Sequence, residues 1–294
     1  MRCALLLLAV PIAAPAAAQK LDGTPRTAVV SGSQPEWLVL QAKVEHSRAR
    51  TVEGVRFVSG ILGDKPVLLF LSGEGVAETA RTSQVALDHF VVRRLVFSGV
   101  ASGIDPALDV GDVVAPDRWA AFPDPASARA TPKASVVRPH GKDAGRPAGR
   151  SKIGPPDTAA RRQEAARAEQ RVWFDTDPDL LAVARAAAPG LSLKRCSATV
   201  CLRASPRVVV GGNGASGPAP LDDASHRDAS EQWVARITDP QSAAAARVAS
   251  ASGVPFIAFG SLSDPAGDAK APAFGPLATD NAARVVVAFL KALP

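Results

Sequence analysis

The sequence contains no tyrosine, few aromatic residues and only three cysteines. Aromatic residues make up 5% of the 294 residues. The four histidines are scattered and form no pattern with cysteine or carboxylate residues that is typical of a metal site or a catalytic triad. We therefore expect neither a bound metal ion nor a cofactor.

Long apolar segments are also missing. The apolar run at residues 3–14 is shorter than the roughly 20 residues that a membrane-spanning helix needs. Arg2 precedes this run, and the three alanines at 16–18 form a small-residue cleavage site. These features predict a signal peptide at residues 1–18, export to the periplasm, and a mature domain over 19–294 without stable membrane insertion.

Excess positive charge is confined to one part of the chain. The net charge is +6 and the sequence pI is about 9.6. The basic residues concentrate between Arg129 and Arg171, where proline, alanine and glycine also dominate. This stretch has no interleaved aromatic residues on which bases would stack, so we expect no nucleic-acid partner. Its composition instead predicts a mobile, exposed insertion at about 123–170.

Two cysteines remain after the predicted cleavage. Cys196 and Cys201 are separated by four residues. Export would place them in an oxidising compartment, so a local disulfide between them is expected.

Apolar periodicity divides the rest of the chain into alternating strands and helices, which predicts an α/β domain around one mixed sheet. The predicted strands lie at 27–30, 55–60, 66–71, 95–97, 110–114, 207–212 and 254–259. The predicted helices begin at residues 33, 77, 177, 239 and 279.

Two helix starts carry clear capping signals. Ser33 is an N-cap candidate, and Glu36 stands three residues later, as in a capping box. Asp239 and Pro240 form an N-cap and first-turn pair for a later helix. Each of these acids therefore has a purely structural interpretation.

The order and spacing of several segments resemble one family. The segments are residues 28–36, 72–75, 98–103, 110–114, 210–214, 254–256 and 261–264. Together they are similar to bacterial methylthioadenosine/S-adenosylhomocysteine nucleosidases and their exported, bark-storage-protein-like relatives. The resemblance covers most of 26–121 and 172–293. It implies a single three-layer α/β domain with a mixed sheet flanked by helices, a purine nucleoside as ligand, and a homodimer.

The resemblance also implies two catalytic acids. Cleavage of an N-glycosidic bond needs a proton donor for the leaving base and a base that activates water. The resemblance assigns the first role to Asp264 and the second to Glu36. Asp264 also stands in an Asp-Pro-Ala-Gly sequence, which is typical of a turn, so a structural role is the alternative.

Further residues are implied to contact the nucleoside. They are Gln241, Ser72, Gly73, Val100, Ala101, Ser102, Gly103, Asn213 and Ser263. Glycines in the 99–103 stretch would let the backbone approach a ligand closely.

The sequence departs from the family pattern at three positions. The family carries a Met-Glu pair whose carboxylate holds the ribose hydroxyls, and this chain has Pro240 and Gln241 there. The family also carries a basic residue at the position of Gly260. Gln241 lacks the charge that would stabilise a ribosyl cation. Two interpretations remain: an exported purine nucleosidase, or a catalytically impaired nucleoside-binding or storage-like protein on the same fold.

Hydrolysis is favoured over phosphorolysis. Phosphorylases of this superfamily place an arginine beside the phosphate, where this chain has Phe97. The carboxylate of Glu74 would in addition repel phosphate.

Overall fold

A computed structural model of the chain describes residues 20–121, 173–198, 200–217, 234–265 and 271–294. The predicted signal peptide and the predicted insertion at about 123–170 lie outside these residues.

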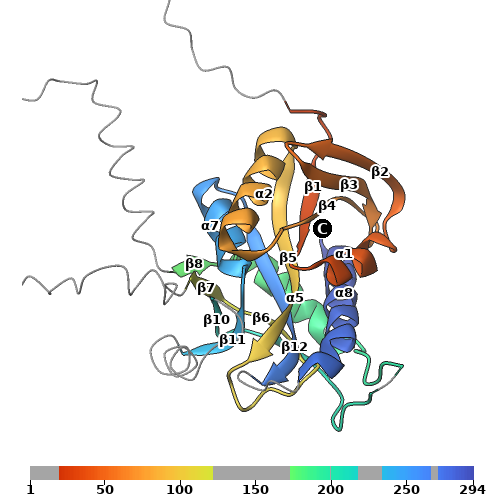
Figure 1. The fold of residues 1–294 in the computed structure, drawn as a ribbon, viewed down its shortest axis with the longest axis vertical. Coiled ribbons are helices and arrows are strands. Elements are labelled where there is room, and N and C mark those ends of the chain that lie inside the picture. The colour runs from red at the N-terminus through yellow and green to blue at the C-terminus, as the bar shows by residue number, and fades with distance from the viewer. Residues whose placement is uncertain (1–19, 122–172, 199, 218–233, 266–270) are drawn as a thin grey trace, which may run out of the picture.

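All the described strands belong to one mixed sheet (Figure 1). They are β1 (Arg26–Ser31), β2 (Glu45–Val52), β3 (Val55–Leu62), β4 (Lys65–Leu71), β5 (Val92–Gly103), β6 (Val113–Ala115), β7 (Arg118–Ala121), β8 (Trp173–Asp175), β9 (Val208–Val210), β10 (Asn213–Ser216), β11 (Ala235–Asp239) and β12 (Phe256–Pro265). The order along the main path is β2-β3-β4-β1-β5-β11-β10-β7-β8. Strand β12 pairs with β5 and β6, and β6 also pairs with β9.

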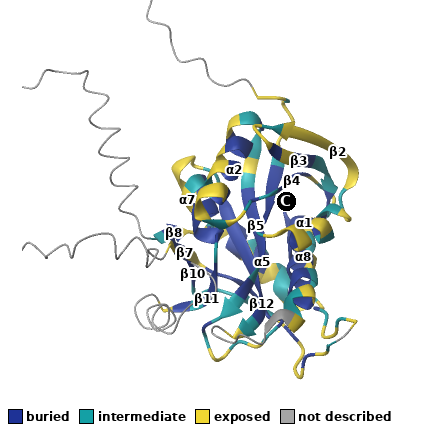
Figure 2. Cartoon of the chain, in the orientation of Figure 1, coloured by how far each residue is buried: buried dark blue, intermediate teal, exposed yellow. Residues whose placement is uncertain are grey.

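Helices cover both faces of this sheet, so the predicted three-layer α/β architecture is confirmed. They are α1 (Gln34–Gln41), α2 (Gly75–His89), α5 (Pro178–Ala187), α7 (Ser242–Ala251) and α8 (Gly275–Ala292), with short 3₁₀ turns η1 (Ala188–Gly190) and η3 (Ala271–Phe274). One apolar core lies between the sheet and helices α2 and α7. The other lies between the sheet and helices α1, α5 and α8. Figure 2 shows the buried strands between these helix layers.

The predicted hairpin across Gly63 and Asp64 is confirmed. Both residues have positive φ, +57° and +62°, as a two-residue type I′ turn requires. Glu53 and Gly54 form a second turn of this kind, with φ of +48° and +78°. It connects β3 to β2, a strand that the apolar pattern does not predict.

Several predicted boundaries are wrong. The strand predicted at 95–97 is longer, since β5 runs from Val92 to Gly103. Strand β12 similarly includes 261–264 and therefore Asp264, so the predicted turn at this residue is replaced by strand pairing. The predicted strand at 110–114 shrinks to β6, and α8 begins four residues before the predicted start. Strands gain length here because each pairs with a neighbour that is distant in sequence, which local periodicity does not register.

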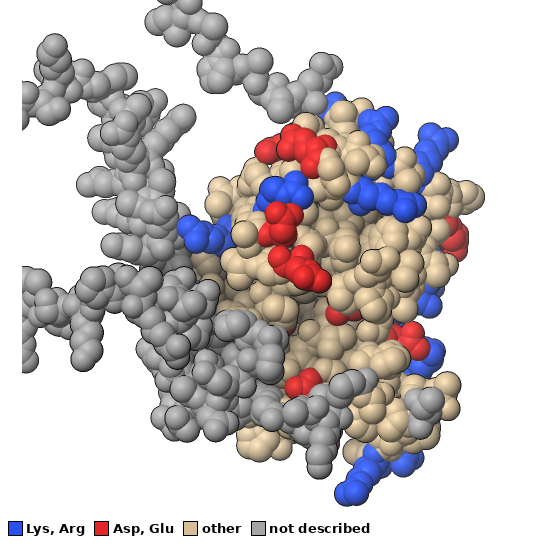
Figure 3. Space-filling model, viewed as in Figure 1, with Lys and Arg blue, Asp and Glu red and all other residues tan. Residues whose placement is uncertain are grey.

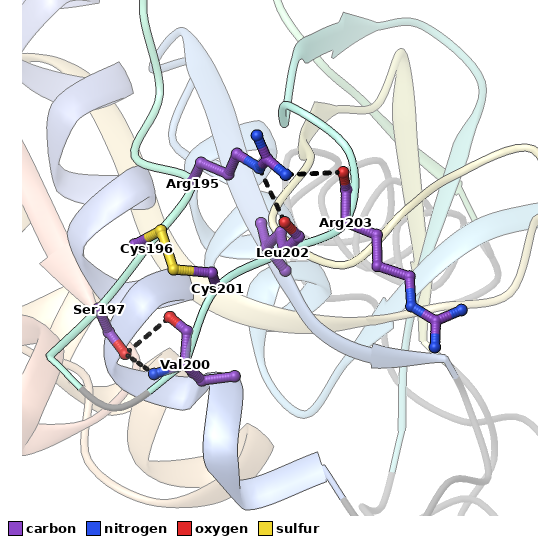
Figure 4. The surroundings of a disulfide bond; sticks show 7 residues. All are labelled: Arg195, Cys196, Ser197, Val200, Cys201, Leu202 and Arg203. Carbon is purple, nitrogen blue, oxygen red and sulfur yellow. Dashed lines mark hydrogen bonds between the residues drawn. A yellow bond between two sulfur atoms is a disulfide. The ribbon is translucent and has the colours of Figure 1, made fainter.

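The predicted disulfide between Cys196 and Cys201 is present (Figure 4). The two cysteines face each other across an isolated antiparallel bridge. Arg195 secures the base of this loop, since its side chain donates to the carbonyls of Leu202 and Arg203 at 2.8 and 3.1 Å.

Candidate active site

Strand β5 changes its neighbour halfway along one edge. Its first half pairs with β1, and this pairing ends where Ser31 lies beside Ser98. Its far end pairs with β11 instead, at Ser102 and Gly103. None of the described strands pairs with the intervening edge. Such a gap at the carboxyl ends of parallel strands is where α/β proteins commonly bind ligands.

Glu36 fills part of this gap. Its Oε1 accepts a hydrogen bond from the Val100 amide at 2.9 Å, and its Oε2 accepts one from the Ser33 amide at 2.8 Å. The second bond belongs to the predicted capping box of α1. Glu36 therefore caps α1, as its structural interpretation requires, and also lies in the gap along β5.

The environment of Glu36 favours its neutral form. The residue is 5% exposed. This burial raises the pKa of the carboxyl group above its usual range, although the amides of Val100 and Ser33 act in the opposite direction. A buried carboxyl with a raised pKa is a suitable proton acceptor near neutral pH.

A cavity of about 410 Å³ opens beside Glu36, within the size range of small-molecule sites. Its walls come from the loops after β1 and β4, the exposed edge of β5, and the start of α7. The lining residues are Gly32, Ser33, Gln34, Pro35, Glu36, Leu71, Gly73, Glu74, Phe97, Gly99, Val100, Asp239, Pro240 and Gln241. None of these described lining residues is lysine or arginine. Figure 3 shows that Lys and Arg lie mostly toward the outer parts of the face viewed, whereas its middle is uncharged or acidic.

Gln241 connects three loops at the floor of this cavity. Its Nε2 donates to the carbonyls of Gly32 and Gly73 at 3.2 and 3.1 Å. Its Oε1 accepts from the Ser72 hydroxyl at 2.9 Å. Gly32 lies between the side chains of Gln241 and Glu36. A Cβ added to Gly32 would be only 3.0 Å from Glu36 Oε2 and 3.1 Å from Gln241 Oε1, so a larger residue would crowd both side chains.

Asp239 holds the backbone of Gln241 in place. Helix α7 begins at Ser242, so Gln241 rather than Asp239 is its N-cap, contrary to the prediction. Asp239 Oδ1 nevertheless accepts from the amides of Gln241 and Ser242 and from the Ser216 hydroxyl, at 2.7–2.9 Å. Burial raises the pKa of this carboxyl, while its hydrogen bonds lower it. An internal carboxylate thus occupies the helix terminus that would otherwise attract an anion.

Gly260 lies in the core rather than in the cavity. A Cβ there would approach Ile237 Cδ1 to 2.7 Å and the Ala101 Cβ to 3.0 Å. No room therefore exists for the basic side chain that the family pattern carries at this position.

Asp264 lies on β12, the strand next to β5. It is in register with Ser102, and the Ser263 hydroxyl donates to its Oδ1. Since Val100 and Ser102 are two residues apart, the two contacts are separated by about 7 Å along β5. Asp264 lines a different cavity, of about 260 Å³, which it shares with Gly103.

The structure therefore brings only some of the predicted site residues together. Glu36, Gln241, Gly73 and Val100 line one cavity, and Ser72 lies behind it. The remaining predicted ligand contacts are distributed elsewhere. Ala101 points into the core, Asn213 Oδ1 accepts from Arg118, and Gly103 and Asp264 line the second cavity, next to Ser102 and Ser263.

Ser216 and Ser242 both pair with Asp239, which the sequence does not predict. Ser216 Oγ bonds Asp239 and also accepts from the Ala243 amide at 2.8 Å. No local pattern indicates this contact, because Ser216 comes from β10, far from α7 in sequence.

Among the described residues, no group of three or more His, Cys, Asp or Glu side chains is placed to hold a metal ion. None of the helices in this part of the chain combines the length and apolarity that crossing a membrane requires.

Comparisons with known proteins agree with this architecture. A family model described as the phosphorylase superfamily matches residues 26–291. A methylthioadenosine/S-adenosylhomocysteine nucleosidase from Colwellia psychrerythraea 34H, solved with adenine, superposes with a TM-score of 0.69 at 18% identity, covering 94% of this chain and 98% of that one. Futalosine hydrolase of Helicobacter pylori gives a TM-score of 0.67 at 17% identity, covering 92% and 98%. These two likenesses show a shared fold.

A curated relative matches a shorter part of the chain. Methylthioadenosine/S-adenosylhomocysteine nucleosidase of Bacillus cereus (strain B4264) is 33% identical over 89 residues, which cover 30% of this chain and 38% of that protein. The match thus spans less than half of the relative.

Proposed function

The chain belongs to the phosphorylase superfamily, and on that premise we propose that it is an exported purine nucleosidase that hydrolyses the N-glycosidic bond of adenosine-type nucleosides. Methylthioadenosine and S-adenosylhomocysteine are the first candidates, since relatives are named for them. The observation that carries the proposal is the buried Glu36 carboxyl, which is held by two amides at the wall of the cavity.

The proposed reaction uses Glu36 and Asp264 as a pair. Water gives a proton to Glu36 while its oxygen bonds to C1′ of the sugar. The bond from C1′ to the purine breaks, and its electron pair leaves with the base, which takes a proton from Asp264. Glu36 binds Val100, and Asp264 is in backbone register with Ser102, two residues further along β5. The corresponding spacing of about 7 Å along β5 suits a sugar at one end and a purine at the other.

Water rather than phosphate is the proposed nucleophile. The described cavity lining has no cationic side chain to bind phosphate, and it holds the carboxylates of Glu36 and Glu74. Phe97 occupies the wall where a phosphate-binding arginine would be needed. Binding of an inorganic dianion would therefore be opposed by charge.

The test is release of free base by the purified mature protein in phosphate-free buffer. Methylthioadenosine, S-adenosylhomocysteine, adenosine and inosine are the substrates. We expect release from at least one of them and no acceleration on adding phosphate. Absence of release from all four at high enzyme concentration would contradict the proposal.

Two neutralising variants assign the acids. Glu36→Gln and Asp264→Asn are each expected to lower kcat by about 10²–10⁴-fold. Glu45→Gln on the exposed strand β2 and Asp88→Asn at the end of α2 are matched controls, since the same chemical changes there leave the cavity untouched. Full activity in either site variant would remove that residue from the mechanism.

The second candidate function is ligand binding without turnover. It is favoured by the neutral amide of Gln241, which donates both of its hydrogens to protein carbonyls, and by the exclusion of a cation at Gly260. Calorimetry with adenine and nucleosides distinguishes the two functions. Tight binding without base release supports the binding protein, whereas turnover that is lost in Asp264→Asn supports the enzyme.

Export and dimerisation are parts of the same proposal. The N-terminal sequence motivates cleavage after residue 18, and mass analysis of periplasmic material is expected to give a chain that starts at Gln19. A homodimer rests on the family resemblance and on the exposed side chains of Leu38 and Val76, which are 50% and 47% exposed. Sedimentation of a purely monomeric species would contradict the dimer.

A further inference from the structure

The Gln241 amide has a fixed orientation. Two carbonyl oxygens, those of Gly32 and Gly73, lie 3.2 and 3.1 Å from its Nε2. Exchanging the amide oxygen and nitrogen would place an oxygen against both carbonyls, so only the orientation with nitrogen facing them is stable. Both amide hydrogens are therefore used within the protein.

A single acceptor position on Gln241 is left for a ligand. An amide oxygen has two lone pairs. The Ser72 hydroxyl has one proton and lies 2.9 Å from both Gln241 Oε1 and the Gly73 carbonyl, and 3.4 Å from the Gly32 carbonyl. The Gly73 carbonyl already accepts from Gln241 Nε2, and Oε1 has no proton of its own, so we assign the Ser72 proton to Oε1. Glu36 retains one lone pair on each oxygen after binding Ser33 and Val100. The proposed reaction requires Glu36 to hold the attacking water, which leaves Gln241 Oε1 as the acceptor for the sugar.

Asp239 has little remaining capacity to accept a hydrogen bond from a sugar hydroxyl. Its Oδ1 already accepts three hydrogen bonds, and its Oδ2 accepts the Ser242 hydroxyl. A ribose presents two adjacent hydroxyls to this floor, at C2′ and C3′. One of them would lose its bonds to water and find no acceptor among these described side chains, which is unfavourable.

The absence of charge on the Gln241 side chain also disfavours a sugar that carries a C2′ hydroxyl. Gln241 is neutral, so it gives less stabilisation to positive charge on the sugar than a carboxylate would. A hydroxyl at C2′ withdraws electrons from C1′ and makes that charge harder to form. A sugar without this hydroxyl needs less electrostatic help, and its remaining C3′ hydroxyl matches the single acceptor on Gln241.

We infer that the preferred substrates are purine 2′-deoxyribonucleosides, and that Gln241 together with Ser72 determines this preference. The inference rests on the proposed nucleosidase function. The products would be the free purine and 2-deoxyribose, with one water consumed.

The experiment compares kcat/KM for adenine release from adenosine, 2′-deoxyadenosine and 3′-deoxyadenosine. We expect 2′-deoxyadenosine to exceed adenosine by about 10-fold, the size of effect that one unsatisfied hydroxyl produces. Adenosine equal to or better than 2′-deoxyadenosine would overturn the inference but keep the nucleosidase. A preference for 3′-deoxyadenosine would also overturn it, because the single acceptor would then serve the C2′ hydroxyl. If base is released neither from these three nucleosides nor from any other nucleoside tested, the proposed function itself is removed.

Two variants test the assigned residues. Ser72→Ala frees the second lone pair of Gln241 Oε1, so the preference for 2′-deoxyadenosine is expected to fall severalfold. Gln241→Glu adds a charged acceptor and is expected to move the ratio further toward adenosine. Ser59→Ala on the exposed side of β3 is the matched control for Ser72→Ala and is expected to leave the ratio unchanged. An unchanged ratio in folded Ser72→Ala and folded Gln241→Glu protein, with folding checked by circular dichroism, would contradict the assignment.

Discussion

The carboxyl group of Glu36 meets two structural demands at once. It caps the first turn of α1 through the Ser33 amide, and it satisfies the Val100 amide on an unpaired edge of β5. Removing Glu36 would therefore leave two amides without an acceptor, which costs about 1–3 kcal/mol for each buried group. Glu36 therefore stabilises the fold in addition to any role it has in the reaction.

This environment predicts a specific pH dependence. Glu36 must be ionised to accept a proton, and burial raises its pKa above the usual range. Activity is therefore lost on acidification while an exposed glutamate, with a pKa of about 4.3, would still be ionised. We expect the acidic limb of log(kcat/KM) against pH to lie clearly above that value. A limb at the ordinary glutamate pKa would show that a different group acts as base.

Gly260 allows a second prediction about a single residue. Introducing arginine at this position would force a charged side chain against Ile237 and Ala101, which are 0% and 4% exposed. Burying an unpaired charge in such a place is expected to cost several kcal/mol of unfolding free energy and to leave activity unimproved. Denaturant unfolding measures the first and adenine release the second. Gly23→Arg, where a Cβ has no neighbour within 4 Å, is the control. A stable and more active Gly260→Arg protein would contradict this account.

At the residue scale, the sequence predicts the local contacts of the site but not the contacts between distant segments. The capping box was predictable because Ser33 and Glu36 are three residues apart. The bond from Val100 to Glu36 spans 64 residues and depends on where β1 ends beside β5. The engagement of Gln241 by Gly32 and Gly73 is equally non-local, so the sequence suggested a ligand-facing amide but not its bonding partners.

At the scale of elements, strands with an apolar pattern were predictable and polar ones were not. Strand β2 is almost fully exposed, and its sequence Glu-His-Ser-Arg-Ala-Arg-Thr-Val has no alternation to detect. Its pairing with β3 is set by the Glu53–Gly54 turn. Strand β11 is short and was missed for a related reason, since its burial comes from β5 and β10 rather than from its own pattern.

The disulfide gives a prediction about one loop. Cys196 and Cys201 are five positions apart, so the bond closes a short loop and limits the unfolded chain only slightly. Reduction is expected to lower the unfolding free energy by about 2 kcal/mol or less. The double variant Cys196→Ser, Cys201→Ser should match the reduced protein in thermal unfolding. Non-reduced periplasmic protein should be lighter than reduced protein by two hydrogens, and two free thiols there would contradict the predicted bond.

For the whole molecule, the two ends of the predicted insertion are close in space. Strand β7 ends at Ala121 and β8 begins at Trp173, and the two strands pair antiparallel with Ala120 beside Trp173. Directly opposed residues of such a pair lie about 4.5–5.5 Å apart. The chain thus leaves and rejoins the sheet at neighbouring positions, as the two strands of a hairpin do.

We therefore expect residues 123–170 to be dispensable for folding. Replacing them with a Gly/Ser linker of about four residues closes a hairpin of ordinary length. Shortening this segment about twelvefold lowers the entropy cost of closure by roughly 2 kcal/mol, because each doubling of loop length costs about 0.6 kcal/mol. The shortened protein should then unfold at the same temperature as the full chain or above it, and it should release adenine at the same rate.

A Gly/Ser segment of the original length separates the effect of length from that of composition. If both the short variant and the long Gly/Ser variant fold but lose activity, the native segment supplies contacts to the nucleoside site. If the short variant aggregates, the segment completes the core, and the composition-based expectation of a dispensable insertion is wrong.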